Sequence, residues 1–396
     1  MIGKVAIIVE RADIALGGAE RSMSEVAQAL SALGVQVDLL AAKGPAGPGN
    51  IRVLCQDFPG KRVSLAVFGD AVRRRLAQGD YDIVHSVLPF EFADLYQPRG
   101  GTYAEAMLRH AASYSNPVTR LYKRWTARAN GRRRELLRAE RRLCTGTKGP
   151  MIAALSRYVV DQLRRHYGTD SGRIVLTLNG VDTGRSVDDN VVRQVRQRLL
   201  AQFTVRQTQE PVLFLFAAHN FRLKGLFPLV KAMQVAGKTD TGRAACLLVA
   251  GAGTDRLARA AGVQDRVRFL GPVRDIRSLL PAVDVGVLPT FYDPSSRFIL
   301  EALAAGKPVI TTRFNGAVDH FTDGRHGRVI DSPDDVGALA DAIRHFTSTA
   351  QIEQAAQAIQ GDDLASRISI HRVARELLDL YRSIGETRRR RLHGSL

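Results

Sequence analysis

Two carboxylates that stand eight residues apart form the strongest chemical signal in the chain. The run from Asp293 to Val309 reads DPSSRFILEALAAGKPV, which places Asp293 in a loop and Glu301 within the helix that follows. A free helix N-terminus offers N–H groups to phosphate or sugar oxygens. A carboxylate accepts hydrogen bonds from a pair of vicinal hydroxyls, as in ribose recognition. For an isolated pair, a surface helix residue and a helix-start residue would be the better interpretation.

Two cations precede a second predicted helix start. Arg222 and Lys224 stand just before Gly225, and we expect a helix from Gly225 to Val235. Most single lysines and arginines are solvated surface charges, but a glycine at a helix start favours anion binding. Cations placed there would stabilise the negative charge of a bound anion such as a phosphate. They can also replace a metal ion, and the sequence shows no metal-ligand constellation, so we expect neither a metal nor a cofactor.

The glycine pair Gly17-Gly18 follows the first predicted strand, Val5 to Val9, and opens a helix. Without Cβ atoms, these residues would let the backbone approach a ligand closely. A tight strand-to-helix turn explains the pair equally well, and both interpretations can hold at once.

Strands and helices alternate in two successive series of similar size. The first begins with Val5–Val9 and continues through Met151–Leu155, and the second begins at Val212–Ala217 and continues beyond Pro308. Alternation of this kind is typical of parallel sheets covered by helices. We therefore predict an α/β fold of two Rossmann-like domains facing an interdomain cleft. The expected domains are residues 1–165 and 166–369.

The formal net charge of +18 is the outlier in the composition of the 396 residues. It favours an anionic partner, such as a nucleic acid, an acidic lipid surface or a phosphorylated acceptor. Three widely spaced cysteines suit a reducing compartment. The apolar N-terminal run is too short for a signal peptide, and no stretch approaches the roughly 20 apolar residues of a membrane span. These features predict a cytoplasmic protein.

A basic segment from Arg120 to Arg142 has three interpretations: a solvated helical face, a nucleic-acid site, or a membrane-binding stretch. It contains ten basic residues and only two acidic ones, Glu135 and Glu140. The pattern predicts one or two amphipathic helices. Leucine, tyrosine and tryptophan between the basic residues suit an anionic lipid surface, at roughly 1 kcal/mol per basic residue.

Taken together, the ordered motifs resemble those of family-4 retaining glycosyltransferases with the GT-B fold. Besides the segments above, the resemblance includes Asn179-Gly180-Val181-Asp182, Ala250-Gly251-Ala252-Gly253 and Phe269-Leu270-Gly271, and it covers nearly the whole chain in order. Within that family, Asp94-Leu95-Tyr96, Tyr103-Ala104-Glu105 and the basic segment look closest to the lipopolysaccharide-core glucosyltransferase subgroup.

The resemblance implies roles for particular residues. Glu301 would bind the ribose hydroxyls of a nucleotide-sugar, Asp293 would hydrogen-bond the transferred sugar, and Arg222 and Lys224 would hold the diphosphate. Other donor contacts are implied at the glycine turn, at the helix start and beside the base, namely by Gly17, Gly18, Ser295, Ser296, Arg297, Val273 and Arg274.

The resemblance also implies the partners and location of the protein. It predicts metal-independent sugar transfer, most simply from a UDP-sugar, to a lipid-linked, lipopolysaccharide or polysaccharide acceptor, by a peripheral protein on the inner face of the membrane. Nucleic acid is not an expected partner. A C-terminal helix of about residues 370–396 would return to the first domain.

Two departures from the family pattern bear on activity. Asp293 is one methylene shorter than the usual Glu. The place of the usual catalytic His or Asp falls near Gly100-Gly101, where no carboxylate stands, although Arg99 could neutralise the donor or an acidic acceptor. In the family's proposed front-face mechanism the departing phosphate takes the acceptor proton, so the protein's task is positioning and charge stabilisation. A nucleotide-sugar epimerase and a non-catalytic GT-B protein or nucleic-acid binder remain the competing functions.

Overall fold

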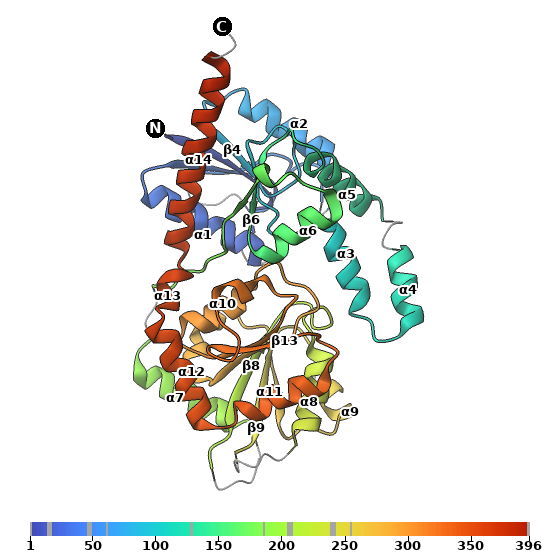
Figure 1. Ribbon diagram of the computed structural model, residues 1–396, viewed down its shortest axis with the longest axis vertical. Helices are drawn as coiled ribbons and strands as arrows, with labels where there is room; N and C mark the ends of the chain where they lie inside the picture. The colour runs from blue at the N-terminus through green and yellow to red at the C-terminus, as the bar shows by residue number, and fades with distance from the viewer. Residues whose placement is uncertain are drawn as a thin grey trace. The chain divides into compact units, whose positions relative to one another are not determined.

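Apolar runs such as Val5–Val9 and Val212–Phe216 form strands that are almost completely buried. Strands buried on both faces belong to parallel sheets with helices on either side. The structure is a computed structural model that describes residues 2–13, 18–45, 50–60, 62–126, 130–184, 187–203, 209–237, 243–253 and 256–393 (Figure 1).

The chain divides into two units. The N-terminal unit comprises Met1–Leu108, Val118–Gly180 and Ile370–Leu396, and the C-terminal unit comprises Arg109–Pro117 and Val181–Ser369. Each unit has its own parallel sheet, as predicted for two Rossmann-like domains.

The N-terminal sheet has the strand order β3-β2-β1-β4-β5-β6-β7 among the described residues. Its strands are β1 (Lys4–Arg11), β2 (Gln36–Lys43), β3 (Ile51–Val53), β4 (Ile83–Ser86), β5 (Leu95–Tyr96), β6 (Met151–Ala154) and β7 (Ile174–Leu176). The helices in this part of the chain are α1 (Gly18–Ala32), α2 (Leu65–Leu76), α3 (Tyr103–Ala112), α4 (Pro117–Thr126), α5 (Gly131–Cys144) and α6 (Arg157–Tyr167), with the short 3₁₀ helix η1 (Ser171–Arg173).

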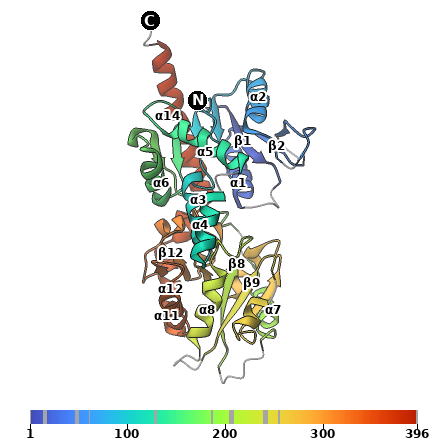
Figure 2. The same ribbon diagram turned by 90° about the vertical axis from the view of Figure 1, so that its right-hand side faces the viewer.

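The C-terminal sheet has the order β10-β9-β8-β11-β12-β13, and Figure 2 shows β8 and β9 side by side. Its strands are β8 (Val212–Ala217), β9 (Ala245–Ala250), β10 (Val267–Gly271), β11 (Val285–Leu288), β12 (Val309–Thr312) and β13 (Gly327–Ile330). Its helices are α7 (Asp189–Leu200), α8 (Leu226–Ala236), α9 (Arg256–Ala260), α10 (Arg297–Ala304), α11 (Val336–His345), α12 (Thr349–Gly361) and α13 (Leu364–Arg367), with the 3₁₀ helices η2 (Ile276–Ser278), η3 (Leu280–Ala282) and η4 (Gly316–His320).

Both sheets reverse their strand order at one point, between β1 and β4 and between β8 and β11. In open parallel sheets, ligands bind beyond the carboxyl ends of the strands at such a reversal. The loops that follow β8 and β11 are therefore the first place to look for a ligand site in the C-terminal unit.

Alternate residues of β1 fill two cores in the N-terminal unit, because successive side chains of a strand point to opposite faces. Val5, Ile7 and Val9 pack with α1 and α14 (Ile370–His393), whereas Ala6 and Ile8 pack on the α2 side. The long C-terminal helix α14 thus covers the N-terminal sheet beside α1.

The boundary between the units differs from the expected position at residues 165/166. It falls at Gly180/Val181, because β7 pairs in parallel with β6 and extends the first sheet. Residues 109–117 also cluster with the C-terminal unit. The sequence did not predict either feature, since β7 is only three residues long and gives a weak periodic signal.

Candidate functional site

The predicted donor-binding residues of the C-terminal unit come from loops at the carboxyl ends of adjacent strands. Residues 218–225 follow β8, residues 289–296 follow β11, and residues 313–316 follow β12. Strands β8, β11 and β12 are neighbours in the sheet, so these three loops meet at one edge. This edge includes the reversal of strand order at which ligands bind in doubly wound sheets.

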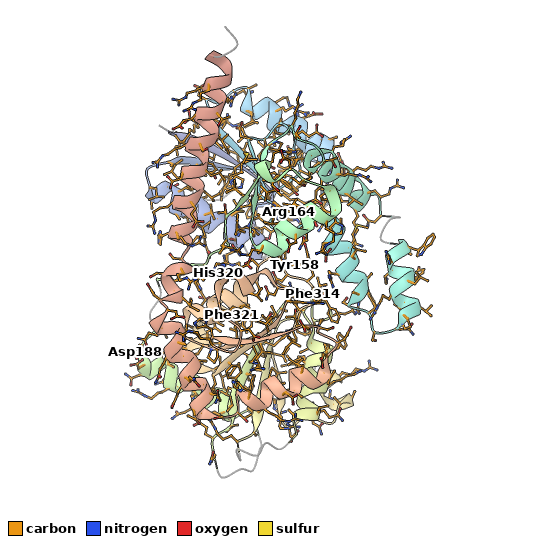
Figure 3. The ribbon with its side chains drawn as sticks, viewed as in Figure 1. Tyr158, Arg164, Asp188, Phe314, His320 and Phe321 are labelled. Carbon is orange, nitrogen blue, oxygen red and sulfur yellow. The ribbon has the colours of Figure 1, made fainter. Side chains whose placement is uncertain are left out.

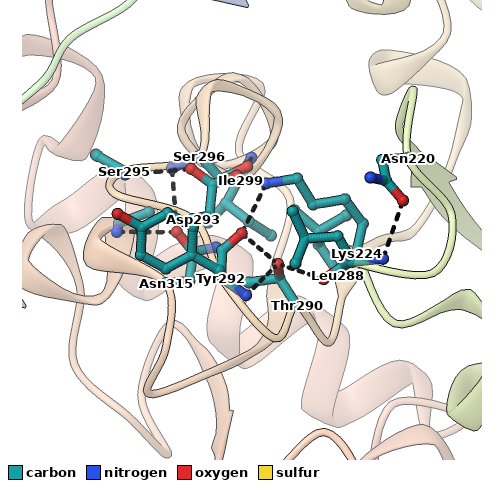
Figure 4. A network of polar contacts seen from close by, with 12 residues as sticks. Asn220, Lys224, Leu288, Thr290, Tyr292, Asp293, Ser295, Ser296, Ile299 and Asn315 are labelled. Carbon is teal, nitrogen blue, oxygen red and sulfur yellow. Dashed lines mark hydrogen bonds and ion pairs between the residues drawn. The ribbon is translucent and has the colours of Figure 1, made fainter. Parts of the chain in front are cut away.

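Lys224 and Asp293 lie in direct contact at this edge. The Lys224 Nζ donates to Asp293 Oδ2 at 2.6 Å and to the Tyr292 carbonyl at 2.9 Å (Figure 4). Their side chains are 22% and 14% exposed, so the pair is mostly shielded from solvent yet not sealed. Residues that are 69 positions apart in the sequence are thereby joined.

Backbone contacts hold Lys224 in place. The Leu223 carbonyl accepts hydrogen bonds from the Phe291 amide and from Thr290 Oγ1, and Asn220 Oδ1 accepts from the Leu223 amide. Gly225 has a φ of 80°, and a Cβ atom on it would lie 1.9 Å from the Pro289 carbonyl oxygen. Only glycine permits this approach of the loop after β8 to the loop after β11.

Asn315 is a site residue that the sequence reading missed. It is fully buried, and its Oδ1 accepts hydrogen bonds from the amides of Ser296 and Ala317, while its Nδ2 donates to Thr311 Oγ1. The Asp293 amide donates to the Phe314 carbonyl, and the Asp293 carbonyl accepts from Gly316. Phe314, labelled in Figure 3, therefore stands in a loop that fixes both Asp293 and the start of α10.

The N-terminus of α10 is capped by protein groups. Ser296 Oγ accepts from the Ile299 amide at 3.4 Å, and the Ser295 amide donates to Asp293 Oδ1 at 3.2 Å. The predicted anion contacts at Ser295 and Ser296 thus coincide with amides that already bond to Asp293 and Asn315. A bound diphosphate or sugar would exchange with these partners.

Glu301 lies about one turn into α10 and is only 6% exposed. Arg297, one turn earlier on the same helix, donates from Nη2 to Glu301 Oε1 at 3.2 Å. A second cation, Arg277, forms ion pairs with Asp182 and Asp275 and is attracted by Glu301. Burial acts to lower the pKa of its guanidinium, but the attraction to these carboxylates outweighs it, and the pKa is raised. The positive charges of Arg297 and Arg277 therefore lie close to the Glu301 carboxylate, the predicted ribose ligand.

The remaining predicted donor contacts belong to the same unit, except for the glycine pair Gly17-Gly18. The Arg222 guanidinium stacks on the Tyr114 ring, 4.3 Å from its centroid, within the C-terminal unit. Val273 is partly buried against the core, and Arg274 is exposed. Gly18 begins α1 in the N-terminal unit and is exposed, whereas Gly17 lies outside the described residues.

The N-terminal unit places a guanidinium near its carboxyl edge. Arg99, which is 9% exposed, donates to Ser22 Oγ, to Asn179 Oδ1 at 2.9 Å and to Gln97 Oε1 at 3.3 Å. Gly101 has a φ of 66°. A buried cation thus stands beside the position at which the resembling family has a His or Asp.

His85 is a core residue of the same unit. It is fully buried, and its Nδ1 contacts the Tyr381 hydroxyl of α14 at 2.7 Å. Burial lowers the pKa of His85 to about 3, and the nearby Arg99 adds to the effect, so the imidazole is neutral at physiological pH. Its role is to attach α14 to the sheet.

The basic segment forms two helices, α4 and α5, and Arg128 between them lies outside the described residues. Helix α4 buries no residue at all. Its apolar side chains at positions 118, 121, 122 and 125 share one helical face, and they are 74%, 58%, 62% and 73% exposed. Helix α5, by contrast, is anchored in the unit through buried Leu136, Glu140 and Leu143.

Two further observations concern the described ranges as a whole. None of their helices combines the length and the apolar character that crossing a lipid bilayer requires. Within the same ranges, no group of three or more His, Cys, Asp or Glu side chains is placed to hold a metal ion.

Family comparisons agree with the motifs. The model described as "Glycosyltransferase Family 4" matches residues 16–185, and the model described as "Glycosyl transferases group 1" matches residues 210–349. Together they span most of both units.

Individual proteins give the same result. The chain is 27% identical over 348 residues to a D-inositol 3-phosphate glycosyltransferase of Pseudarthrobacter chlorophenolicus, covering 80% of this chain and 78% of the relative. It is 40% identical over 93 residues to the lipopolysaccharide core biosynthesis glycosyltransferase LpsE of Rhizobium meliloti, covering 24% and 27%. The crystal structure of WaaG, a glycosyltransferase involved in lipopolysaccharide biosynthesis, matches with a TM-score of 0.75 at 21% identity, covering 95% of this chain and 99% of that one. This likeness confirms the predicted GT-B fold.

Proposed function

Because the chain belongs to glycosyltransferase family 4, we propose that it transfers a sugar, with retention of anomeric configuration, from a UDP-sugar to a saccharide acceptor carried on a lipid. The observation that carries the proposal is the contact between Lys224 and Asp293 at the strand-order reversal of the C-terminal sheet. In this proposal Asp293 binds the transferred sugar, and Lys224 binds the diphosphate.

The donor would lie across the carboxyl ends of β8 and β11. Its diphosphate would bind Lys224 and Arg222, its sugar would bind Asp293, and its ribose hydroxyls would bind Glu301. Lys224 is already oriented by the Tyr292 carbonyl, which reduces the reorganisation needed when the phosphate arrives. Arg222 would leave the face of Tyr114 to reach the second phosphate, so its contribution depends on a rearrangement.

In this proposal the C1–O bond to the diphosphate breaks, and a C1–O bond to the acceptor hydroxyl forms on the same face of the sugar. The proton of the acceptor hydroxyl moves to an oxygen of the departing diphosphate. The protein supplies position and charge stabilisation, since negative charge builds on the leaving group as the bond breaks. A neutral, buried His85 takes no part in this transfer.

The lipid-linked acceptor is supported by the similarity to LpsE, whose name describes lipopolysaccharide core biosynthesis, and by the exposed face of α4. An apolar stripe flanked by Arg120, Lys123 and Arg124 suits the interface of a bilayer with anionic headgroups. Each basic residue near such a surface contributes about 1 kcal/mol. We therefore propose that the protein works at the inner face of a membrane and is held there by α4.

A nucleotide-sugar hydrolysis assay tests the proposed activity. Purified protein is incubated with UDP-, GDP- and ADP-glucose, UDP-galactose and UDP-N-acetylglucosamine, and released nucleoside diphosphate is measured. We expect slow release from one UDP-sugar, abolished in the variant Asp293→Ala. The absence of release from all five compounds, together with no stabilisation by any nucleoside diphosphate, would refute the proposal.

A vesicle assay tests the membrane contact separately. Trp125 is the sole tryptophan of the chain and is 73% exposed, so its emission reports directly on α4. We expect a blue shift with phosphatidylglycerol vesicles and none with phosphatidylcholine vesicles. The variant Leu121→Glu should lose co-sedimentation with the anionic vesicles, whereas Leu33→Glu, at a surface leucine of the same unit that is 41% exposed, should retain it. Equal binding of both variants would contradict the assignment of α4.

A further inference from the structure

A pocket of about 280 Å³ lies between α2 and α5 of the N-terminal unit. The connection from β4 to β5, residues 87–94, forms its third side. This connection crosses one face of the sheet, because it joins the carboxyl end of one parallel strand to the amino end of the next. None of the predicted donor residues lines this pocket.

Aromatic rings form its apolar part. Phe90 and Phe92 stack with ring centroids 4.9 Å apart and an interplanar angle of 23°. The Arg73 guanidinium covers the Phe92 ring at 4.8 Å from the centroid. Gly69 permits this packing, because a Cβ atom there would lie 3.0 Å from the Phe90 ring. The result is an apolar cluster on a loop, held against α2, in which Phe90 is buried and Phe92 is half-buried.

Alternating carboxylates and guanidinium groups form its rim. Arg73 pairs with Asp70 at 3.1 Å, and Arg142 pairs with Glu91 at 3.6 Å. All four side chains are more than half exposed, from 61% to 73%, so they remain available to a ligand. The two guanidinium groups of the rim thus donate hydrogen bonds in a planar arrangement, and each carboxylate beside them can accept hydrogen bonds from two hydroxyls.

This combination selects for a particular ligand chemistry. An acyl chain would displace water from the charged rim and form no hydrogen bonds in its place, so its binding would be unfavourable there. A phosphate would meet carboxylates as well as guanidinium groups, so the balanced rim gives it little net attraction. A pyranose ring has an apolar C–H face for the aromatic pair and hydroxyls around its edge for the rim. The volume, near the lower end of the roughly 300–1,000 Å³ typical of ligand pockets, suits a single ring.

We propose that this pocket is a binding subsite for one pyranose ring of the saccharide acceptor. That this pyranose belongs to the acceptor rests on the proposed function, whereas the affinity of the pocket for a pyranose does not. The exposed part of half-buried Phe92 supplies the apolar contact, and Asp70 and Arg142 bind hydroxyls at the two sides. A subsite on this unit would hold a sugar of the acceptor away from the reacting hydroxyl and so contribute to acceptor selectivity.

Ligand-observed NMR and calorimetry on the full chain test the subsite. The probes are the methyl α-pyranosides of glucose, galactose and mannose, with glycerol as a polyol that lacks a ring. We expect at least one pyranoside to bind in the millimolar range and glycerol not to bind. Phe92→Ala should weaken that binding about tenfold or more, as truncation of a central aromatic contact does. The matched control is Phe58→Ala, at a phenylalanine of the same unit that is 44% exposed and lies outside the pocket; it should bind as the parent does.

A second variant blocks the pocket without removing a contact. Ala66 is exposed and lines the pocket, so Ala66→Trp should fill it and abolish pyranoside binding at an unchanged melting temperature. Binding by none of the pyranosides, or equal affinity in parent and both variants, would overturn the proposal. Stabilisation by UDP is measured in parallel and should persist in both variants. Failure of UDP to stabilise the parent would refute the proposed function alone, because pyranoside binding is read independently.

Discussion

Buried Glu140 should make the stability of the N-terminal unit depend strongly on pH. Its carboxylate is fully buried on α5 and accepts hydrogen bonds from Tyr96 Oη at 2.8 Å, from Tyr167 Oη at 2.5 Å and from the Tyr103 amide at 2.7 Å. Burial raises the pKa of Glu140 from 4.5 to about 7, although these hydrogen bonds act in the opposite direction. The perturbation is Glu140→Gln, which removes the titration and keeps the size of the side chain.

The sign and magnitude follow from linkage. Between pH 4.5 and 7 the folded protein retains the Glu140 proton and the unfolded chain releases it, so the free energy of unfolding falls as the pH rises. The stability is thus fully present below the unfolded pKa and lost as the pH passes through the folded one. At 1.36 kcal/mol per pKa unit, this shift in the pKa of Glu140 corresponds to about 3 kcal/mol. For a unit of this size that amounts to roughly 6–12 °C in melting temperature.

Differential scanning calorimetry at half-unit steps from pH 4.5 to 8 measures the effect. The replacement of one carboxyl oxygen by an amide NH₂ group in Glu140→Gln carries a cost that is independent of pH. The difference in melting temperature between parent and variant should therefore shrink by the calculated amount as the pH rises to 7 and be constant above it. Glu386→Gln, at an exposed residue of α14, should parallel the parent throughout. A constant difference across the range would refute the reasoning, because it would mean that Glu140 titrates alike in the folded and unfolded states.

Three predictions concern the C-terminal unit. Lys224→Met should reduce kcat by about 10²–10³, the usual cost of one lost transition-state contact, whereas Lys231→Met on the exposed side of α8 should not, as steady-state kinetics will show. Gly225→Ala should lower the free energy of unfolding, measured by urea titration, by roughly 2–5 kcal/mol, because the backbone is left-handed and the new Cβ atom clashes with Pro289. The control is Gly306→Ala, which has a φ of 71° and open space around it and should cost only about 1–2 kcal/mol. Asn315→Ala leaves two buried amides without their acceptor and should cost roughly 2–5 kcal/mol and weaken UDP binding; equal UDP affinity in parent and variant would contradict its role in fixing the site.

The sequence predicted the elements that have strong local signals. The strands that contain Val5–Val9 and Val212–Phe216 formed as expected, because each is a continuous apolar run. Short strands such as β5 and β7 have no periodicity of their own, and they form because neighbours supply hydrogen bonds. The predicted boundary between the units was misplaced for this reason.

The candidate site was predictable only in part. Motif spacing identified Lys224 and Asp293 separately, but their contact depends on β8 and β11 being neighbours, which no local pattern specifies. Asn315 gives no sequence signal, because an asparagine after a strand is typical of any turn. Arg277 was missed for a similar reason: its link to Glu301 arises from the packing of η2 on α10.

The central claim is that the C-terminal unit binds a nucleoside diphosphate through Glu301 and Lys224, and thermal stabilisation by UDP tests it most directly. With UDP at 100 times its dissociation constant, a ligand that binds only the folded state adds about 2.7 kcal/mol, which corresponds to roughly 5–10 °C for this unit. We predict such a rise for the parent and none for Glu301→Ala at the same UDP concentration. An unchanged melting temperature in the parent, or an equal rise in the variant, would contradict the account.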